Sequence, residues 1–214
     1  MSQAELCADA ARTVALTLRQ CLADCRAERE ASGKADEAVD AELDNILSLL
    51  QGIDWQNADP TQLQASHHPV VEQLAGLAAP EGTALAALLP HLPALPWRYS
   101  YEARADQPDI GQRMAWAELV GPIAPFESHT VCLGLTAIGP GLRYPEHRHP
   151  AVETYLVLTG TARWTLDGDT RERPPGALIL HPSNATHVMH TADDPLLAIY
   201  AWTGEVETLS SYVE

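Results

Sequence analysis

The sequence predicts a mainly β protein, built as an antiparallel sandwich or barrel, with an α-helical extension at its N-terminus. The first half of the chain is rich in Ala, Leu, Arg and Glu at helical spacing. The second half contains short runs of β-branched and aromatic residues separated by Gly, Pro and Asp. Because no helical pattern lies between these runs, an antiparallel arrangement is favoured over a parallel α/β sheet.

Three helical segments are expected in the extension. The first covers about 4–30, where Ser32 and Gly33 end it, and the second runs from near Ala35 until Gly52 interrupts it. A third begins with Asp59 as N-cap and Pro60 at the first helical position, and helix is expected up to about residue 79. The apolar positions that predict the first helix are Leu6, Ala10, Val14, Leu18 and Leu22.

Prolines at 80, 90, 93 and 96 indicate a linker over 80–96. We therefore expect a helical extension with its proline-rich linker over 1–96 and a β domain with the functional site over 97–214. The strands of that domain are expected at WRYSY (97–101), RMAWAELV (113–120), HTVCLGLTAI (129–138), TYLVLTG (154–160), ARWTL (162–166), ALIL (177–180) and LLAIYAW (196–202).

The composition excludes several classes of function. With 13 Lys+Arg against 29 Asp+Glu, the formal net charge of −16 repels nucleic acid and anionic lipid. No apolar run reaches the roughly 20 residues of a membrane-spanning helix, and the start of the chain has no basic or apolar leader pattern. The expectation is a soluble, cytoplasmic protein with no nucleic-acid or membrane partner. Its four cysteines are expected to be reduced.

A first cluster of chemically capable residues lies between Gly141 and Gly160. His147 and His149 are two residues apart, so on an extended chain their imidazoles share a face. Glu153 and Tyr155 have the same odd parity and follow a turn at Pro150, so the next strand can return them to that point. Two imidazoles and a carboxylate are typical ligands of a first-row metal ion.

A second cluster supplies a further imidazole. Gly176 and Asn184 can adopt positive φ, Pro182 fixes a bend, and His187 can reach the same point from a neighbouring strand. Three His and one Glu suit Fe(II), Mn(II), Zn(II), Ni(II) or Co(II). Of the other histidines, His181 falls outside this spacing and is expected to be structural, as are His190 and the aromatic Tyr101.

These two clusters resemble the two motifs of the cupin superfamily. The first motif, G(X)5HXH(X)3–4E(X)6G, is met in full from Gly141 to Gly160. The second, G(X)5PXG(X)2H(X)3N, is met at Gly176, Pro182 and His187, with Asn184 and Thr191 in place of its middle Gly and final Asn. The resemblance implies a cupin double-stranded β-helix, a jelly-roll barrel, that binds a metal ion.

The stretch YPEHRHPAVETYLVLTG, the late Trp202 and the helical extension before a single barrel make the chain similar to the bacterial cupin-type dimethylsulfoniopropionate (DMSP) lyases of the DddQ and DddL type. The resemblance implies Fe2+, Zn2+ or Mn2+ as cofactor and a small zwitterionic sulfonium as substrate. It implies metal ligands at His147, His149, Glu153 and His187, and in some members at the tyrosine corresponding to Tyr155. A catalytic tyrosine before the HxH pair corresponds to Tyr144.

The implied reaction is a metal-assisted β-elimination that yields acrylate and dimethyl sulfide. Dimethyl sulfide leaves as a neutral molecule, so the protein needs one well-placed base, and a tyrosinate beside a cation can serve. Tyr144 is favoured as that base and Tyr155 is the alternate. The aromatic faces of Trp202 and Tyr200 are candidates for holding the sulfonium.

Two other functions fit the same ligands. One is an Fe(II)-dependent cupin dioxygenase of a small thiol or acid, and the other is a non-catalytic, metal-dependent sensor or binding module. The sequence leaves open whether His147 and Tyr155 bind the metal directly and whether the chain forms a homodimer.

Overall fold

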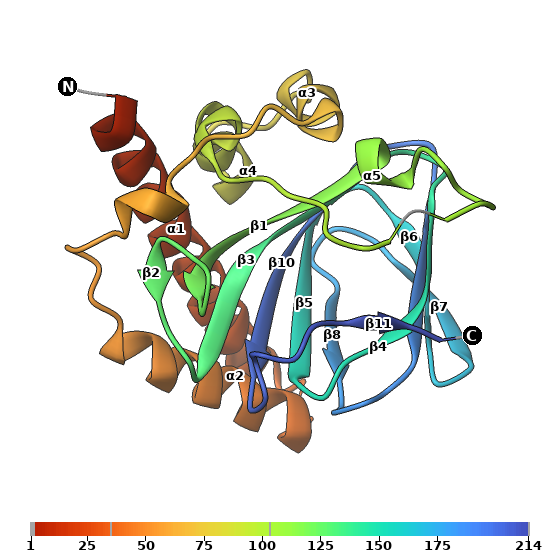
Figure 1. Ribbon diagram of the computed structural model, residues 1–214. Coiled ribbons are helices and arrows are strands. Elements are labelled where there is room, and N and C mark those ends of the chain that lie inside the picture. The colour runs from red at the N-terminus through yellow and green to blue at the C-terminus, as the bar shows by residue number, and fades with distance from the viewer. Residues whose placement is uncertain (1–2, 35, 103, 214) are drawn as a thin grey trace.

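The computed structural model describes residues 3–34, 36–102 and 104–213. Helices occupy most of the first half and strands most of the second, as expected (Figure 1). The helical segments are α1 (Gln3–Ser32), α2 (Glu37–Leu49), η1 (Leu50–Gly52), η2 (Pro60–Gln62), α3 (Pro69–Ala75), α4 (Ala84–Leu88), η3 (Leu89–Ala94) and α5 (Ile110–Arg113). The strands are β1 (Met114–Gly121), β2 (Phe126–Glu127), β3 (Val131–Ile138), β4 (Arg143–Arg148), β5 (Val152–Thr159), β6 (Ala162–Leu166), β7 (Asp169–Arg173), β8 (Leu178–His181), β9 (His187–Thr191), β10 (Leu196–Thr203) and β11 (Ser211–Tyr212).

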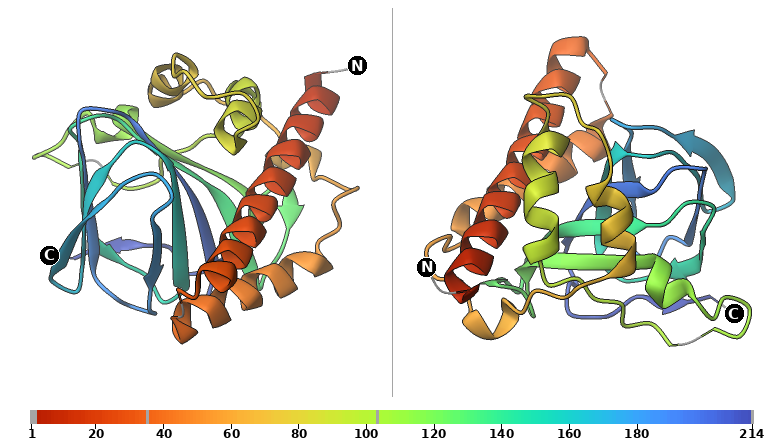
Figure 2. Two further views of the ribbon diagram at one scale, coloured as in Figure 1. Left: turned by 180° about the vertical axis from the view of Figure 1, so that it is seen from behind. Right: turned by 90° about the horizontal axis from the view of Figure 1, so that it is seen from above.

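The strands form two sheets that face each other (Figures 1 and 2). One sheet has the order β2-β1-β3-β10-β5-β8 and the other has the order β11-β4-β9-β6-β7. The pairs are antiparallel except for the short parallel pair of β1 and β2. Neighbouring strands along the chain, such as β4 and β5, belong to different sheets, and this crossing is what later brings the site residues together.

The helices cover the outer face of the larger sheet, where α1 runs as a long diagonal in front of the strands in the left view of Figure 2. Side chains alternate between the two faces of a strand, so Leu133 and Leu135 of β3 pack with the helices while Cys132 faces the space between the sheets. Val14 and Leu18 of α1 belong to the same buried cluster as those leucines. The helical and β halves therefore share one layer of apolar packing.

The expected helix up to residue 79 is wrong in extent. Asp59 does cap a turn, accepting a hydrogen bond from the amide of Thr61 at 2.8 Å, but the turn is the short η2. The residue before a proline is biased towards extended backbone, and His68 before Pro69 has φ −129° and ψ 130°. Helix therefore restarts only at Pro69 and ends at Ala75.

The strand expected over 97–101 is also wrong. Only Arg98 pairs with another segment there, through an isolated bridge to Trp116. The two tyrosines of this stretch make ring contacts in place of a ladder, with Tyr99 and Tyr101 packing on Trp116 at centroid distances of 5.7 and 5.4 Å. Conversely, β7 was not expected, because its sequence DTRER is polar. The structure leaves most of this strand exposed.

The proline-rich stretch 80–96 contains α4 and η3. Its Leu88, Leu92 and Leu95 are fully buried in the cluster under α1. The indole of Trp97 donates a hydrogen bond to the carbonyl of Leu92 at 2.7 Å, which ties the end of this stretch down. The division of the chain at residue 97 stays a prediction.

Among the described residues, no helix combines the length and apolar character that crossing a bilayer requires.

Two leucines of α1 provide a test of this packing. Leu18 is fully buried against the sheet, whereas Leu16, two residues earlier, is 38% exposed. We expect Leu18→Ala to lower the free energy of unfolding by about 2–5 kcal/mol, because it leaves a cavity between helix and sheet. Leu16→Ala, measured by the same chemical denaturation, should change it by less than about 1 kcal/mol. Equal effects of the two substitutions would contradict the shared core.

Candidate metal centre

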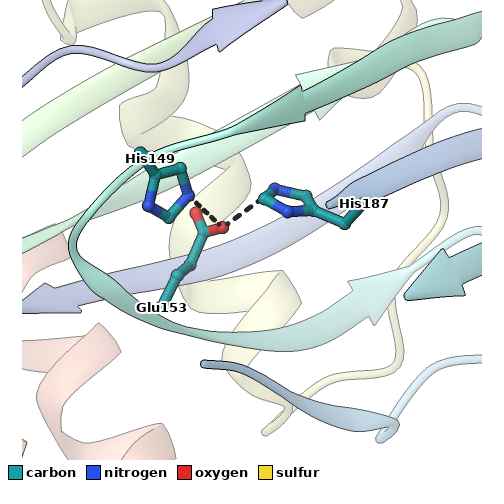
Figure 3. A group of neighbouring side chains, drawn as sticks. All are labelled: His149, Glu153 and His187. Carbon is teal, nitrogen blue, oxygen red and sulfur yellow. Dashed lines mark hydrogen bonds and ion pairs between the residues drawn. The ribbon is translucent and has the colours of Figure 1, made fainter. Parts of the chain in front are cut away.

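Three buried side chains from two sheets meet at the corner between β4 and β5. His149 lies in that corner, Glu153 is near the start of β5, and His187 begins β9. Their ligand atoms all lie within 4.8 Å of one another. Oε2 of Glu153 is 3.0 Å from Nε2 of His149 and 3.4 Å from Nε2 of His187 (Figure 3). Both imidazoles point at the carboxylate from opposite sides.

The second motif holds the corner in place. Asn184 has φ 61°, so asparagine adopts here the left-handed backbone in which the cupin motif has glycine. The backbone N–H of Asn184 donates to the carbonyl of His149 at 2.9 Å, and Oγ of Ser183 donates to the carbonyl of Pro150 at 2.6 Å. Thr191, at the position of the motif's final Asn, donates through Oγ1 to the carbonyl of Gly139 at 2.6 Å. Both departures from the motif are therefore compatible with its turns.

His147 and Tyr144 reach the same side of β4 through a bulge. The register of β4 with β9 shifts between the pairs Tyr144↔Met189 and His147↔His187. Two residues three apart would face opposite sides of a regular strand, but an extra residue restores a common side. Both side chains are buried, and the phenol ring stacks on the imidazole at a centroid distance of 3.9 Å. His147 also lies edge to face with His187 at 4.0 Å, although it is outside the three-residue group.

The hydrogen bonds of three histidines define their tautomers. Nδ1 of His147, His149 and His187 lies 2.8, 3.0 and 3.0 Å from a backbone carbonyl, which can only accept a hydrogen bond. Nδ1 therefore carries a proton in all three, and Nε2 bears the lone pair whenever the ring is neutral; in His149 the protonated ring also donates from Nε2 to Oε2 of Glu153 at 3.0 Å. This tautomer, held by a carbonyl, is the one in which histidine binds metals through Nε2.

The charges of the group depend on each other. Burial opposes ionisation of Glu153, yet the adjacent His149 and the hydrogen bonds from the surrounding imidazoles hold the pKa of its carboxyl well below the usual range. Burial lowers the pKa of His149, but the Glu153 carboxylate outweighs it and the net pKa is raised. For His147, burial and the neighbouring His187 hold the pKa well below the usual value.

This donor set fits a divalent metal ion. Nε2 of His187 is buried and has no hydrogen-bond partner among the described residues, although its lone pair faces the Glu153 carboxylate. A buried polar atom of this kind normally has a partner, and a cation between imidazole and carboxylate would supply one. Two neutral imidazoles and one carboxylate oxygen match first-row metals such as Fe, Mn and Zn.

A family model described as dimethylsulfoniopropionate lyase matches residues 41–198. The chain belongs to the DMSP lyase family. The DMSP lyase DddQ of Ruegeria pomeroyi is 35% identical over 113 residues, which are 52% of this chain and 56% of that protein. The putative DMSP lyase DddL of Cereibacter sphaeroides is 33% identical over 118 residues, 54% of this chain and 49% of that protein. The chain thus spans about half the length of the curated relatives it matches.

Two solved structures of DMSP lyases share the fold across nearly the whole chain. One, from the crystal structures of RdDddP and RnDddQII, has a TM-score of 0.71 and 26% identity, and covers 97% of this chain and 100% of its own. The other, DddQ from Ruegeria pomeroyi, has a TM-score of 0.67 and 27% identity, and covers 90% and 95%. The expected mainly β cupin fold with an N-terminal helical region is confirmed.

In this member of the DMSP lyase family, the candidate centre lies in a cavity of about 610 Å³ between the sheets. The four predicted aromatic site residues, Tyr144, Tyr155, Tyr200 and Trp202, all line it. Burial raises the pKa of all three tyrosines well above the usual value, and the Glu153 charge adds to this for Tyr155. A Cβ at Gly134 would lie 2.6 Å from a ring carbon of Tyr200, so this strand position leaves room for the ring only as glycine.

Two residues that were expected to be structural contact the site directly. The hydroxyl of Tyr101 is hydrogen-bonded to that of Tyr144, and its ring is held by stacking on Tyr212 at 4.7 Å. His181, fully buried at the end of β8, lies with Nδ1 3.0 Å from Oε2 of Glu153. Neither residue occupies a specified position of the two motifs, and only the pairing of distant segments brings them to the site.

Trp202 has a contact that the sequence does not suggest. Its indole N–H donates to Oε1 of Glu153 at 2.6 Å, and its ring stacks on His149 at 4.1 Å. One face of the indole is therefore covered by an imidazole, while the residue still lines the cavity. Trp202 thus holds the carboxylate oxygen opposite the one that the histidines face.

Proposed function

We propose that the chain cleaves dimethylsulfoniopropionate to acrylate and dimethyl sulfide by metal-assisted β-elimination. The observation that carries the proposal is the buried group of His149, Glu153 and His187, whose ligand atoms converge beside an aromatic cavity in a member of the DMSP lyase family. The relatives named as DMSP lyases support the same substrate class.

His149, Glu153 and His187 would hold the metal ion, with His147 as the candidate fourth ligand because its Nε2 is also unprotonated. A divalent cation there would supply Lewis-acid stabilisation of the negative charge that develops on the substrate carboxylate. Fe2+, Zn2+ and Mn2+ remain the candidates, because two imidazoles and a carboxylate accept each of them.

Tyr144 is the favoured base. As the phenolate it accepts the proton from the carbon next to the substrate carboxylate, the C–H electron pair forms the C=C bond, and the C–S pair leaves with neutral dimethyl sulfide. Burial disfavours a phenolate, so this role requires a positive charge nearby. The hydroxyl of Tyr101, bonded to that of Tyr144, orients the phenol towards the cavity. Tyr155 is the alternate base because it lines the same cavity.

The sulfonium end of the substrate is proposed to lie against the aromatic wall of the cavity. A sulfonium is a weakly hydrated cation, and aromatic faces attract such groups by about 0.5–2 kcal/mol. Tyr200 offers a cavity-lining ring, and Trp202 offers the part of its indole that His149 leaves uncovered. A cytoplasmic location and a homodimer stay predictions.

One assay separates this function from its two competitors. The purified, metal-loaded chain is incubated with dimethylsulfoniopropionate in sealed vials, with and without air, and dimethyl sulfide, acrylate and O2 are measured. Equal amounts of acrylate and dimethyl sulfide without O2 consumption are expected. Turnover that requires O2 would favour a dioxygenase, and a ligand-dependent protein complex without turnover would favour a binding module.

A further inference from the structure

The register of the larger sheet places three polar side chains in one row. Trp202 of β10 is the cross-strand partner of Glu153 in β5, and Glu153 is in turn the partner of His181 in β8. Directly opposite residues of adjacent strands project to the same side. The row therefore presents an indole N–H and an imidazole to the two sides of one carboxylate, with all three residues on the inner face of the sheet.

The hydrogen bonds of His181 give it the opposite tautomer from the three histidines described above. The indole of Trp164 can only donate, and its Nε1 lies 2.9 Å from Nε2 of His181, so that nitrogen accepts. The proton is therefore on Nδ1, which donates to Oε2 of Glu153 at 3.0 Å. Because both ring nitrogens are engaged, His181 has no lone pair left for a metal ion.

From this geometry we infer that His181, oriented by Trp164, is a positioning residue that fixes the Glu153 carboxylate for metal binding. The inference rests on the proposed metal site. Trp202 holds Oε1 at 2.6 Å, and His181 holds Oε2, the atom that His149 and His187 face. With both oxygens held, the carboxylate cannot rotate about its last bond. The exposed fractions of His181 and Trp164 are 0% and 1%, so water does not replace either contact.

Two isosteric substitutions separate this role from simple packing. The amide nitrogen of asparagine can take the place of Nδ1, whereas the amide of glutamine reaches the position of Nε2, where its oxygen can accept from Trp164. His181→Asn therefore retains a donor towards Glu153, and His181→Gln retains only the acceptor that faces Trp164. If His181 merely filled space, the two substitutions would have similar effects, because both side chains are polar, neutral and no larger than about the size of the imidazole.

The test measures Zn2+ affinity of the full chain by competition with a chelator, together with thermal unfolding of the metal-free proteins. We expect His181→Gln to bind Zn2+ about 10–100-fold more weakly than the wild type, the range typical for partners of metal ligands. His181→Asn should stay within a few-fold of the wild type. Trp164→Phe, which frees Nε2 of His181, should weaken binding as well. The absorption spectrum of the Co2+-loaded variants should change in the same order, because it reports ligand geometry.

Each other outcome overturns a defined part of the inference. Equal Zn2+ affinities of the wild type and His181→Gln would remove the positioning role. Loss of Zn2+ in His181→Asn as complete as in Glu153→Gln would identify His181 as a direct ligand. Nitrogen-15 NMR of the metal-free wild type is expected to show the proton of His181 on Nδ1, and a proton on Nε2 would refute the tautomer whatever the variants do. A wild type that binds no divalent metal would instead refute the proposed metal site itself.

Discussion

Replacing Tyr144 by phenylalanine is expected to lower kcat for dimethylsulfoniopropionate cleavage by about 10²–10⁴-fold, the usual contribution of a general base. The substitution removes only the hydroxyl, which is bonded to that of Tyr101. The ring that stacks on His147 at 3.9 Å is retained, so the metal affinity should stay close to that of the wild type. Dimethyl sulfide release is measured at saturating substrate, and metal content is measured on the same samples.

Two further variants make the result specific to Tyr144. Tyr99→Phe removes a hydroxyl that bonds Tyr212 at 3.1 Å and does not line the cavity, so its turnover should equal that of the wild type. Tyr155→Phe tests the alternate base. Full activity of Tyr144→Phe together with a large loss in Tyr155→Phe would transfer the role of base to Tyr155.

The second large effect is expected for Glu153→Gln. Glutamine keeps the size of the side chain but removes the negative charge that His149, His187 and His181 face. Because the carboxylate is a proposed ligand, we expect metal affinity to fall by at least about 100-fold, beyond the range usual for outer partners. Turnover should fall with it and should not recover at metal concentrations that saturate the wild type.

His67→Ala is the matched control for this substitution. His67 is 77% exposed and pairs with Glu72 at the surface, far from the motif residues in sequence. The His67→Ala variant should bind the metal ion as the wild type does in the same chelator competition. Metal binding by Glu153→Gln that equals the wild type would exclude Glu153 as a ligand and, with it, the proposed site.

Local sequence was sufficient to predict the residues of the three-residue group. His149, Glu153 and His187 were predicted from short spacings, because a turn at Pro150 and a bend at Pro182 keep each cluster within a few residues. Asn184 was predicted to tolerate positive φ, and its φ of 61° agrees. The helical spacing of α1 predicted its buried face, except that Leu6 at the start is 48% exposed.

Contacts between distant segments were not accessible in the same way. Tyr144 was favoured as the base from its place before the HxH pair, but its spacing of three from His147 does not predict a common side, and the bulge against β9 is what places them together. Tyr101 was expected to pack in the core, and its bond to Tyr144 depends on a segment 43 residues away in the chain. His181 was set aside because it falls outside the ligand position of the second motif, yet the pairing of β8 with β5 brings it to Glu153.

The sequence by itself determined the helical extension, the β half and the residue types that converge on one site, because backbone propensity and two-residue alternation act over short distances. The tertiary structure alone decided which nitrogen of His181 is protonated and which partners hold the Glu153 carboxylate. These properties depend on hydrogen bonds that the indoles of Trp164 and Trp202 donate from other strands. A hydrogen-bond partner selects a tautomer by its position in space, and that position follows from strand register between segments that the sequence does not place side by side.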